Sequence, residues 1–222
     1  MVLEGYERFT EKFQLFNGIL AEFNQKYNLT AISDEKEVYI KHFFDSVKPQ
    51  KYFPTDAKVV EIGSGGGFPS IPLKIVRDDL SFTLIESTGK KCEYLRQAVD
   101  KLGFDGVQVL NIRAEDGGKD KDLREKFDVA TARAVARLNT LCEYCLPFVK
   151  TGGRFIAYKG DADEEIKEAE NAIKTLGGEI EKVEKYDLPE GFGKRTVIVI
   201  KKVKSTPVKY PRGRGLERKK PL

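Results

Sequence analysis

The 222-residue sequence has no tryptophan, one methionine, one histidine and three cysteines. So few cysteines, in odd number, argue against a disulfide framework and indicate a reducing compartment, so we expect a cytoplasmic protein. No segment approaches the roughly 18 consecutive apolar residues of a membrane span, and the N-terminus lacks the apolar stretch of a secretory signal. Cys142 and Cys145 form an isolated pair inside an amphipathic stretch, which favours core packing over metal binding or redox chemistry. We expect no bound metal and no membrane contact.

Charge is distributed unevenly along the chain. The net charge is +4, but the segment after Ile200 contains only one acid, Glu217. Its basic residues are Lys201, Lys202, Lys204, Lys209, Arg212, Arg214, Arg218, Lys219 and Lys220. A basic segment on an acidic body favours contact with a polyanion, and the alternative is a solvated chain end.

The apolar pattern predicts helices first and then an alternation of strands and helices. Apolar residues at steps of three and four predict an amphipathic helix within 4–25, and a second helix is expected over 34–47. Strands are expected at Lys58–Ile62, Ser81–Ile85, Val107–Ile112, Phe127–Thr131 and Gly153–Tyr158, with helices at 69–77, 89–102, 137–149 and 162–176. The last two strands, Ile180–Leu188 and Arg195–Val203, are joined by a link so short that they must form an antiparallel hairpin.

These elements predict a doubly wound α/β fold of the Rossmann-like kind, with five parallel strands closed by an antiparallel β-hairpin. We expect a helical N-terminal extension over 1–50, a sheet domain over 51–203 and a basic tail over 204–222.

A glycine-rich loop follows the first expected strand and opens a helix. Its glycines include Gly63, Gly65 and Gly67, with Glu61 two residues before the first. A dinucleotide loop needs glycine where this sequence has Phe68, which is too large for the helix–strand contact. The spacing instead resembles motif one of the class I methyltransferases, which bind S-adenosylmethionine. That cofactor has no phosphate, and its sulfonium and ammonium groups suit a nearby carboxylate such as that of Glu61.

Polar residues also follow the other parallel strands. Glu86 follows the second strand, where a carboxylate can accept both ribose hydroxyls of an adenosine. Ala114 and Glu115 follow the third strand and are expected near the adenine, while Arg133 and Lys159 follow the fourth and fifth. Because the carboxyl ends of parallel strands share one edge of the sheet, we expect these residues to converge there.

Several segments together resemble the bacterial RsmG/GidB family, the 16S ribosomal RNA guanine-N7 methyltransferases. The matching segments run from about residue 15 to 222 and include residues 28–32, 42–46, 61–69, 113–115, 132–136, 158–160, 210–212 and 220–222. The resemblance implies an S-adenosyl-L-methionine cofactor contacted by Gly63, Phe68, Ala114, Glu115 and Arg133. It implies 16S ribosomal RNA in the small ribosomal subunit as substrate. The family often has Asp in place of Glu61 and Gly in place of Ser70.

Guanine N7 carries a lone pair and no proton, so its methylation needs no general base and depends on positioning and loss of water. We expect Arg133 to orient the guanine through O6, and Lys159 to contact O6 or a phosphate. Along the tail, Arg212, Arg214, Lys219 and Lys220 are expected to bind RNA, and Tyr210 is a candidate for stacking on an unpaired base. His42 has either a structural role or one near the substrate.

Two other classes of function remain open at this stage. One is a methyltransferase of another RNA, a protein or a small molecule, and the other is a nucleotide- or RNA-binding protein without catalysis. The first would transfer methyl groups without ribosomal RNA. The second would bind the cofactor or RNA and transfer no methyl group. We expect a monomer.

Overall fold

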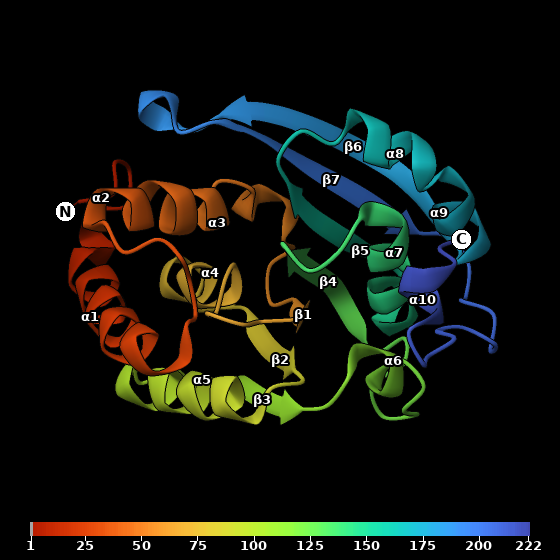
Figure 1. Ribbon diagram of the computed structural model, residues 1–222, viewed down its shortest axis with the longest axis horizontal. Coiled ribbons are helices and arrows are strands. Elements are labelled where there is room, and N and C mark those ends of the chain that lie inside the picture. Colours follow the sequence, from red (N-terminus) through yellow and green to blue (C-terminus); the bar gives the residue numbers. More distant parts are fainter. Residues whose placement is uncertain (1) are drawn as a thin grey trace.

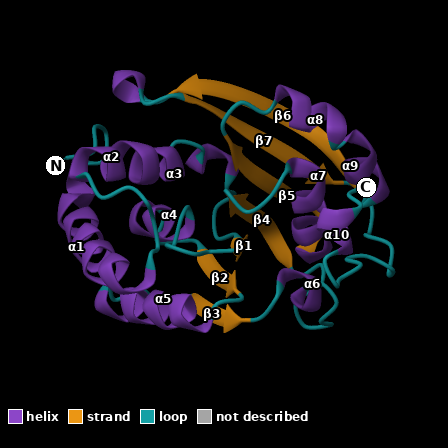
Figure 2. Cartoon of the chain, viewed as in Figure 1, coloured by secondary structure: helices purple, strands orange, loops and turns teal. Residues whose placement is uncertain are grey.

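The computed structural model describes residues 2–222 and contains one seven-stranded sheet (Figures 1 and 2). The spatial order of the strands is β3-β2-β1-β4-β5-β7-β6. The strands are β1 (Lys58–Ile62), β2 (Ser81–Glu86), β3 (Val107–Asn111), β4 (Phe127–Arg133), β5 (Val149–Lys159), β6 (Gly178–Asp187) and β7 (Lys194–Lys202). The pairs among β1 to β5 are parallel, whereas β7 is antiparallel to both β5 and β6. The predicted fold class is confirmed.

Both faces of the sheet are buried, because successive strand residues point to opposite sides. Val59 belongs to one hydrophobic core and Val60 to the other. A parallel strand covered on both faces needs apolar residues at nearly every position, which explains the β-branched run in β1.

Helices from the first half of the chain cover one face. They are α1 (Thr10–Tyr27), α4 (Ser70–Val76) and α5 (Gly89–Lys101), and they lie on the left of the view in Figure 1. Phe13, Phe16 and Phe23 of α1 are buried in the same core as Val59 and Ile156 of the sheet. The N-terminal helices therefore pack onto the sheet and share its core.

Helices from the second half cover the other face. They are α6 (Ala114–Gly117), α7 (Leu138–Cys145), α8 (Asp163–Glu168), α9 (Glu170–Thr175) and α10 (Leu216–Lys219). Cys142 and Cys145 of α7 are free and fully buried in this second core, as the sequence predicts, and burial raises the pKa of both thiols.

The helix expected over 34–47 is helical but not uniform. It consists of α2 (Glu35–Glu37), π-helical turns at Val38–Phe44 and α3 (Asp45–Val47). Wide turns of this kind often occur at functional sites. Here they bring the Lys41 carbonyl, His42 and Asp45 to one guanidinium, that of Arg133.

Two expected helices have different limits. The helix expected over 137–149 ends at Cys145, and Val149 already belongs to β5, because Pro147 lies in a short 3₁₀ turn between them. The helix expected over 162–176 divides at Ala169, whose N–H donates to the carbonyls of both Glu165 and Ile166. α6 was not predicted.

The segment after β7 folds back onto the molecule. Thr206, Tyr210 and Glu217 are all buried, with exposed fractions of 4%, 6% and 0%. The expectation that Tyr210 stacks on a base is therefore wrong, because its ring packs into the second core.

Candidate active site

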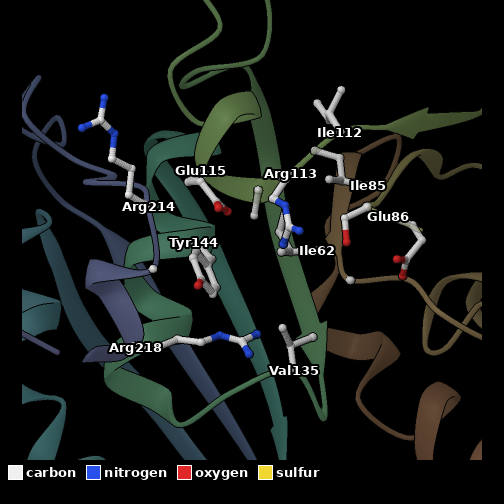
Figure 3. Close-up of a pocket in the computed structure, with 14 residues that line it drawn as sticks. Ile62, Ile85, Glu86, Ile112, Arg113, Glu115, Val135, Tyr144, Arg214 and Arg218 are labelled. Carbon is white, nitrogen blue, oxygen red and sulfur yellow. The ribbon is translucent and has the colours of Figure 1, made fainter. Parts of the chain in front are cut away.

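A cavity of about 400 Å³ opens at the carboxyl edge of the sheet (Figure 3). The loops after β1, β2, β3 and β4 all contribute to its lining. Of the residues predicted to bind a cofactor, four line it: Gly63, Glu86, Ala114 and Glu115. These four residues therefore converge on one cavity, as the positions of the strand ends predict.

The glycine loop can follow its path only with glycine at two positions. Gly63 has φ +71°, and a Cβ there would lie 2.7 Å from the Val135 side chain. Gly67 has φ +85°, and a Cβ there would lie 2.5 Å from Ile71. The Gly63 N–H donates to the Ile85 carbonyl at 2.8 Å, which ties the loop to the end of β2. The loop, strand and helix approach one another so closely that no side chain fits at these two positions.

Glu86 is fixed by the loops on either side of it. Its Oε2 accepts a hydrogen bond from the Gly65 N–H at 3.1 Å, and its Oε1 accepts one from the Thr88 N–H at 2.8 Å. Each carboxylate oxygen can accept further bonds. Because Glu86 lines the cavity, its carboxylate is held ready to accept hydroxyl donors from a ligand.

The remaining walls of the cavity combine apolar and aromatic groups with three arginines, Arg113, Arg214 and Arg218. Ile85 and Ile112 contribute from β2 and from the residue after β3, and Tyr144 contributes from α7. An apolar cleft with a few fixed polar groups is the usual form of a site for a small ligand. The sequence reasoning missed these apolar and aromatic residues, although Ile85 and Ile112 adjoin strand ends that it did identify.

Glu61 does not line this cavity. Its side chain is 0% exposed, and its Oε2 accepts a hydrogen bond from the Ser70 N–H at 3.2 Å. Burial raises the pKa of the Glu61 carboxyl to about 8, and the nearby Arg133 only partly opposes that effect. Glu61 therefore lies behind the glycine loop and supports it from the core. Its predicted contact with a cofactor stays a prediction.

Phe68 lies outside the first cavity as well. Its ring stacks on the His42 ring with centroids 4.4 Å apart, and the Arg133 guanidinium lies 4.9 Å from its centroid. Phe68 thus packs beneath a second group of polar side chains.

That second group borders another cavity, of about 300 Å³. Lys41, His42, Asp45, Arg133, Lys159 and Arg195 contribute the polar part of its lining. Both residues predicted to be catalytic, Arg133 and Lys159, are among them.

Arg133 is held by three groups from the π-helical segment and α3. Its Nη1 donates to the Lys41 carbonyl at 3.2 Å and to Asp45 Oδ2 at 3.2 Å. Its Nη2 lies 3.0 Å from His42 Nδ1. Arg195 also lies near Asp45, with 3.3 Å between Nε and Oδ2. The arginine is therefore rigid, as a residue that orients a substrate must be.

The contacts of His42 define its protonation state. Because Arg133 has only donors, His42 Nδ1 must accept, and Nε2 then carries the proton and donates to Thr30 Oγ1 at 2.8 Å. Burial, reinforced by the charge of Arg133, lowers the pKa of His42 to about 3. A neutral imidazole that uses both nitrogens in this way positions Arg133 and takes no proton from a substrate.

Lys159 is also fixed within the protein. Its Nζ donates to the Ala136 carbonyl at 2.6 Å and pairs with Glu165 Oε2 at 2.7 Å. Only 9% of its side chain is exposed. The amine borders the second cavity, but two of its three donors are already engaged.

One short segment separates the two cavities. Arg133 and Ala134 line the second cavity, and Val135 lines the first. Residues 133–135, at the end of β4 and just after it, therefore form a shared wall.

Comparison with known proteins identifies the family. The model of the GidB family, described as rRNA small subunit methyltransferase G, matches residues 9–192. The chain belongs to this family. It is 48% identical over 221 residues to the ribosomal RNA small subunit methyltransferase G of Lactobacillus johnsonii, covering 97% of this chain and 92% of that protein. The protein of the same name from Brevibacillus brevis is 49% identical over 219 residues, with the same coverages of 97% and 92%.

Solved structures extend the likeness of fold beyond the GidB family. A SAM-dependent methyltransferase from Aquifex aeolicus aligns with a TM-score of 0.56 at 17% identity, covering 78% of this chain and 96% of that one. M. jannaschii TYW2, solved in complex with AdoMet, aligns with a TM-score of 0.54 at 16% identity, covering 70% and 74%. This chain therefore shares its fold with these two solved proteins.

The four tail residues predicted to bind RNA lie in different surroundings in this GidB-family chain. Arg212 pairs with Glu143, with Nη2 and Oε2 2.7 Å apart, and Arg214 lines the first cavity. Lys219 and Lys220 are exposed at the end of α10. RNA contact by these residues stays a prediction, although the guanidinium of Arg212 is already engaged.

Two kinds of feature are absent from residues 2–222. These residues contain no cluster of three or more His, Cys, Asp or Glu side chains arranged to hold a metal ion. In the same range, no helix combines the length and apolarity needed to cross a bilayer.

Proposed function

We propose that this protein is an S-adenosylmethionine-dependent methyltransferase that acts, in the cytoplasm, on guanine N7 of 16S ribosomal RNA in the small ribosomal subunit. The observation that carries the proposal is the cavity at the carboxyl edge of the sheet, with Glu86 fixed beside the glycine loop. Membership of the rRNA small subunit methyltransferase G family supports the substrate.

The first cavity fits the adenosine part of the cofactor. The Glu86 carboxylate is fixed by two backbone N–H groups and is available to accept the ribose hydroxyls. Ile85 and Ile112 offer apolar surface for a purine, and Glu115 lines the same cavity. When bound, S-adenosylmethionine supplies an electrophilic methyl group on a sulfonium. Gly63, Ala114 and Glu115 hold the cofactor together with Glu86, while Gly65 acts through its bond to Glu86.

The second cavity suits the methyl acceptor. Arg133 is rigid and presents a planar set of donors, which match an oxygen acceptor such as guanine O6. Lys159 borders the same space. His42 is neutral with both nitrogens engaged, and Asp45 is paired with two arginines. None of these groups is poised to remove a proton, which fits N7 because N7 has no proton to lose.

Transfer of a labelled methyl group tests the proposal. Purified protein is incubated with labelled S-adenosylmethionine and either small subunits or naked 16S RNA, both from cells that lack this methylation. Digestion to nucleosides and mass spectrometry should find the label in 7-methylguanosine. Label in another nucleoside, in a protein or in a small molecule would overturn the guanine-N7 assignment. Binding of cofactor and RNA without transfer would make the protein a non-catalytic binder.

Replacement of Glu86 tests the cofactor site separately. Glu86→Ala removes a fixed acceptor, so the Kd for S-adenosylhomocysteine should rise about 10- to 100-fold by calorimetry. Glu93→Ala, at an exposed position on α5, removes a carboxylate away from the cavity and should leave the Kd unchanged. An unchanged Kd for Glu86→Ala would remove this residue from the site.

A further inference from the structure

The segment 206–222, here called the C-terminal strap, lies against α6 and α7 at the carboxyl edge of the sheet (Figure 1). Arg124 fixes its first part, since Nη2 donates to the Thr206 carbonyl at 2.7 Å and Nη1 to the Tyr210 carbonyl at 2.8 Å. Lys119 Nζ donates to the Arg212 carbonyl at 3.2 Å. Three carbonyls of the strap are thus held by side chains from outside it.

A buried ion pair fixes the next part. Glu143 of α7 is 1% exposed, and its Oε1 accepts bonds from the backbone N–H and the Nε of Arg212, at 2.8 and 2.9 Å. A buried carboxylate that loses its cation is strongly unfavourable. Glu143 therefore strongly favours the closed position of the strap.

The last turn of the strap is held in the same way. The carboxylate of Glu217, which is 0% exposed, accepts a hydrogen bond from the Gly213 N–H, and the Glu217 carbonyl accepts one from Thr140 Oγ1 at 3.0 Å. A frayed, solvated chain end would not bury these groups. The strap is a built part of the fold.

The strap carries three residues into the lining of the first cavity: Arg214, Gly215 and Arg218. In Figure 3, the guanidinium of Arg214 points away from Glu115 and from the cavity, whereas that of Arg218 points toward Val135. Val135 is the residue that a Cβ on Gly63 would meet, so Arg218 faces the end of the cavity bounded by the glycine loop. Tyr144 lines the same cavity, and burial raises the pKa of its hydroxyl while the nearby Arg218 partly opposes that rise.

We propose that the strap is one wall of the cofactor site and that Arg218 pairs with the α-carboxylate of the cofactor's methionine part. The inference rests on the proposed function. Glu86 and Glu115 suit the adenosine half, and neither can pair with a carboxylate. A guanidinium matches a carboxylate through two parallel hydrogen bonds. Arg218 supplies that group at the opposite end of the same cavity.

Two ligands separate the roles of the strap. S-Adenosylhomocysteine has the carboxylate, and 5′-methylthioadenosine has the adenosine but no amino-acid part. Arg218→Ala should raise the Kd for S-adenosylhomocysteine about 10- to 100-fold and leave the Kd for methylthioadenosine nearly unchanged. Lys219→Ala, the same loss of charge at the next residue of α10, should change neither Kd.

Opening the strap should have a different signature. Arg212→Ala removes the cation from Glu143 and should raise the Kd of both ligands, because the whole strap loses the ion pair that fixes it. In the native protein, S-adenosylhomocysteine should slow hydrogen exchange of the strap amides, and in Arg212→Ala these amides should exchange faster from the start.

The outcomes are distinct. If Arg218→Ala raises the Kd of both ligands by the same factor, the carboxylate pairing is overturned. If it changes neither Kd, the pairing is overturned and Arg218 does not belong to the site. Strap amides that exchange alike with and without ligand, together with unchanged Kd values for Arg212→Ala, would overturn the wall itself. If the native protein binds neither ligand, the proposed function fails instead. Because Arg218 is exposed, its replacement should leave circular dichroism and Tm unchanged.

Discussion

Replacing His42 with glutamine should remove an acid-sensitive group from the fold while leaving an uncharged polar side chain at this position. The pKa of His42 is lowered from 6.5 to about 3, chiefly by burial. A histidine with a depressed pKa contributes stability that is present above pH 6.5 and is lost as the pH falls toward 3. Each pH unit within that window lowers the free energy of unfolding by at most about 1.4 kcal/mol.

At pH 5 the native protein should therefore have lost at most about 2 kcal/mol through His42 alone. The ring is partly exposed, so solvent screening reduces this figure to about 1 kcal/mol or slightly more. At pH 7.5 the variant should be the less stable protein by about 1–2 kcal/mol, because it loses the stacking on Phe68 and a bond to a charged group.

Urea denaturation of both proteins at pH 7.5, 6.0 and 5.0 measures the effect. Carboxylates titrate in both proteins, so the difference between the two free energies of unfolding isolates His42. That difference should shrink by about 1 kcal/mol between pH 7.5 and pH 5.0. A constant difference would show that His42 does not titrate as its contacts require, and the neutral, accepting Nδ1 would be refuted.

Three further predictions follow from other groups. The pKa of Glu61 is raised from 4.5 to about 8, so its ionisation opposes folding as the pH rises through that window; Glu61→Gln should flatten this loss of stability in urea titrations, and parallel curves would contradict it. Arg133→Lys keeps the charge beside Asp45 but loses the planar set of donors, so methyl transfer should fall at least about 10-fold at a temperature where the variant is still folded; equal activity would exclude Arg133 from orienting the base. Replacing Lys219 and Lys220 together with alanine should reduce the slope of log Kd for RNA against log salt by about 1–2, and an unchanged slope would exclude both from the RNA interface.

The part of the site closest to the glycine loop could be predicted because its signals are local. The glycines, the strand before them and Glu86 at the end of the next strand fix one sheet edge by the rules of parallel strands. The structure places Gly63, Glu86, Ala114 and Glu115 in one cavity accordingly. The five parallel strands and the terminal antiparallel hairpin were predicted from equally local signals, whereas the spatial order of the strands was not predicted.

The second cavity could not be assembled from the sequence. His42 and Arg133 are 91 residues apart and meet only because the helical segment 35–47 packs across the end of β4. No pattern in the sequence predicts the π-helical turns of this segment, because its apolar residues also fit an ordinary α-helix. The role of His42 could therefore not be decided between structure and substrate.

The packing of the strap onto the body could not be predicted, because its composition is that of a solvated segment. Inside the protein, Arg212 pairs with Glu143 and the Gly213 N–H donates to Glu217, whereas Lys209, Arg214, Arg218, Lys219 and Lys220 are exposed. Just before it, Lys202 is 0% exposed and donates to the carbonyls of Leu146 and Val149. Buried partners of this kind come from distant segments, so charge counts along the chain cannot reveal them.

The wall formed by residues 133–135 is common to the two cavities, so a movement of this segment would change both of them. A ligand that presses on Val135 in the first cavity acts on the same strand end that carries Arg133 in the second. The affinities of the two ligands are then linked, and the linkage is reciprocal: the factor by which one changes the affinity of the other is the same in both directions. A ligand in one cavity that shifts residues 133–135 would therefore act on the other cavity as a heterotropic effector.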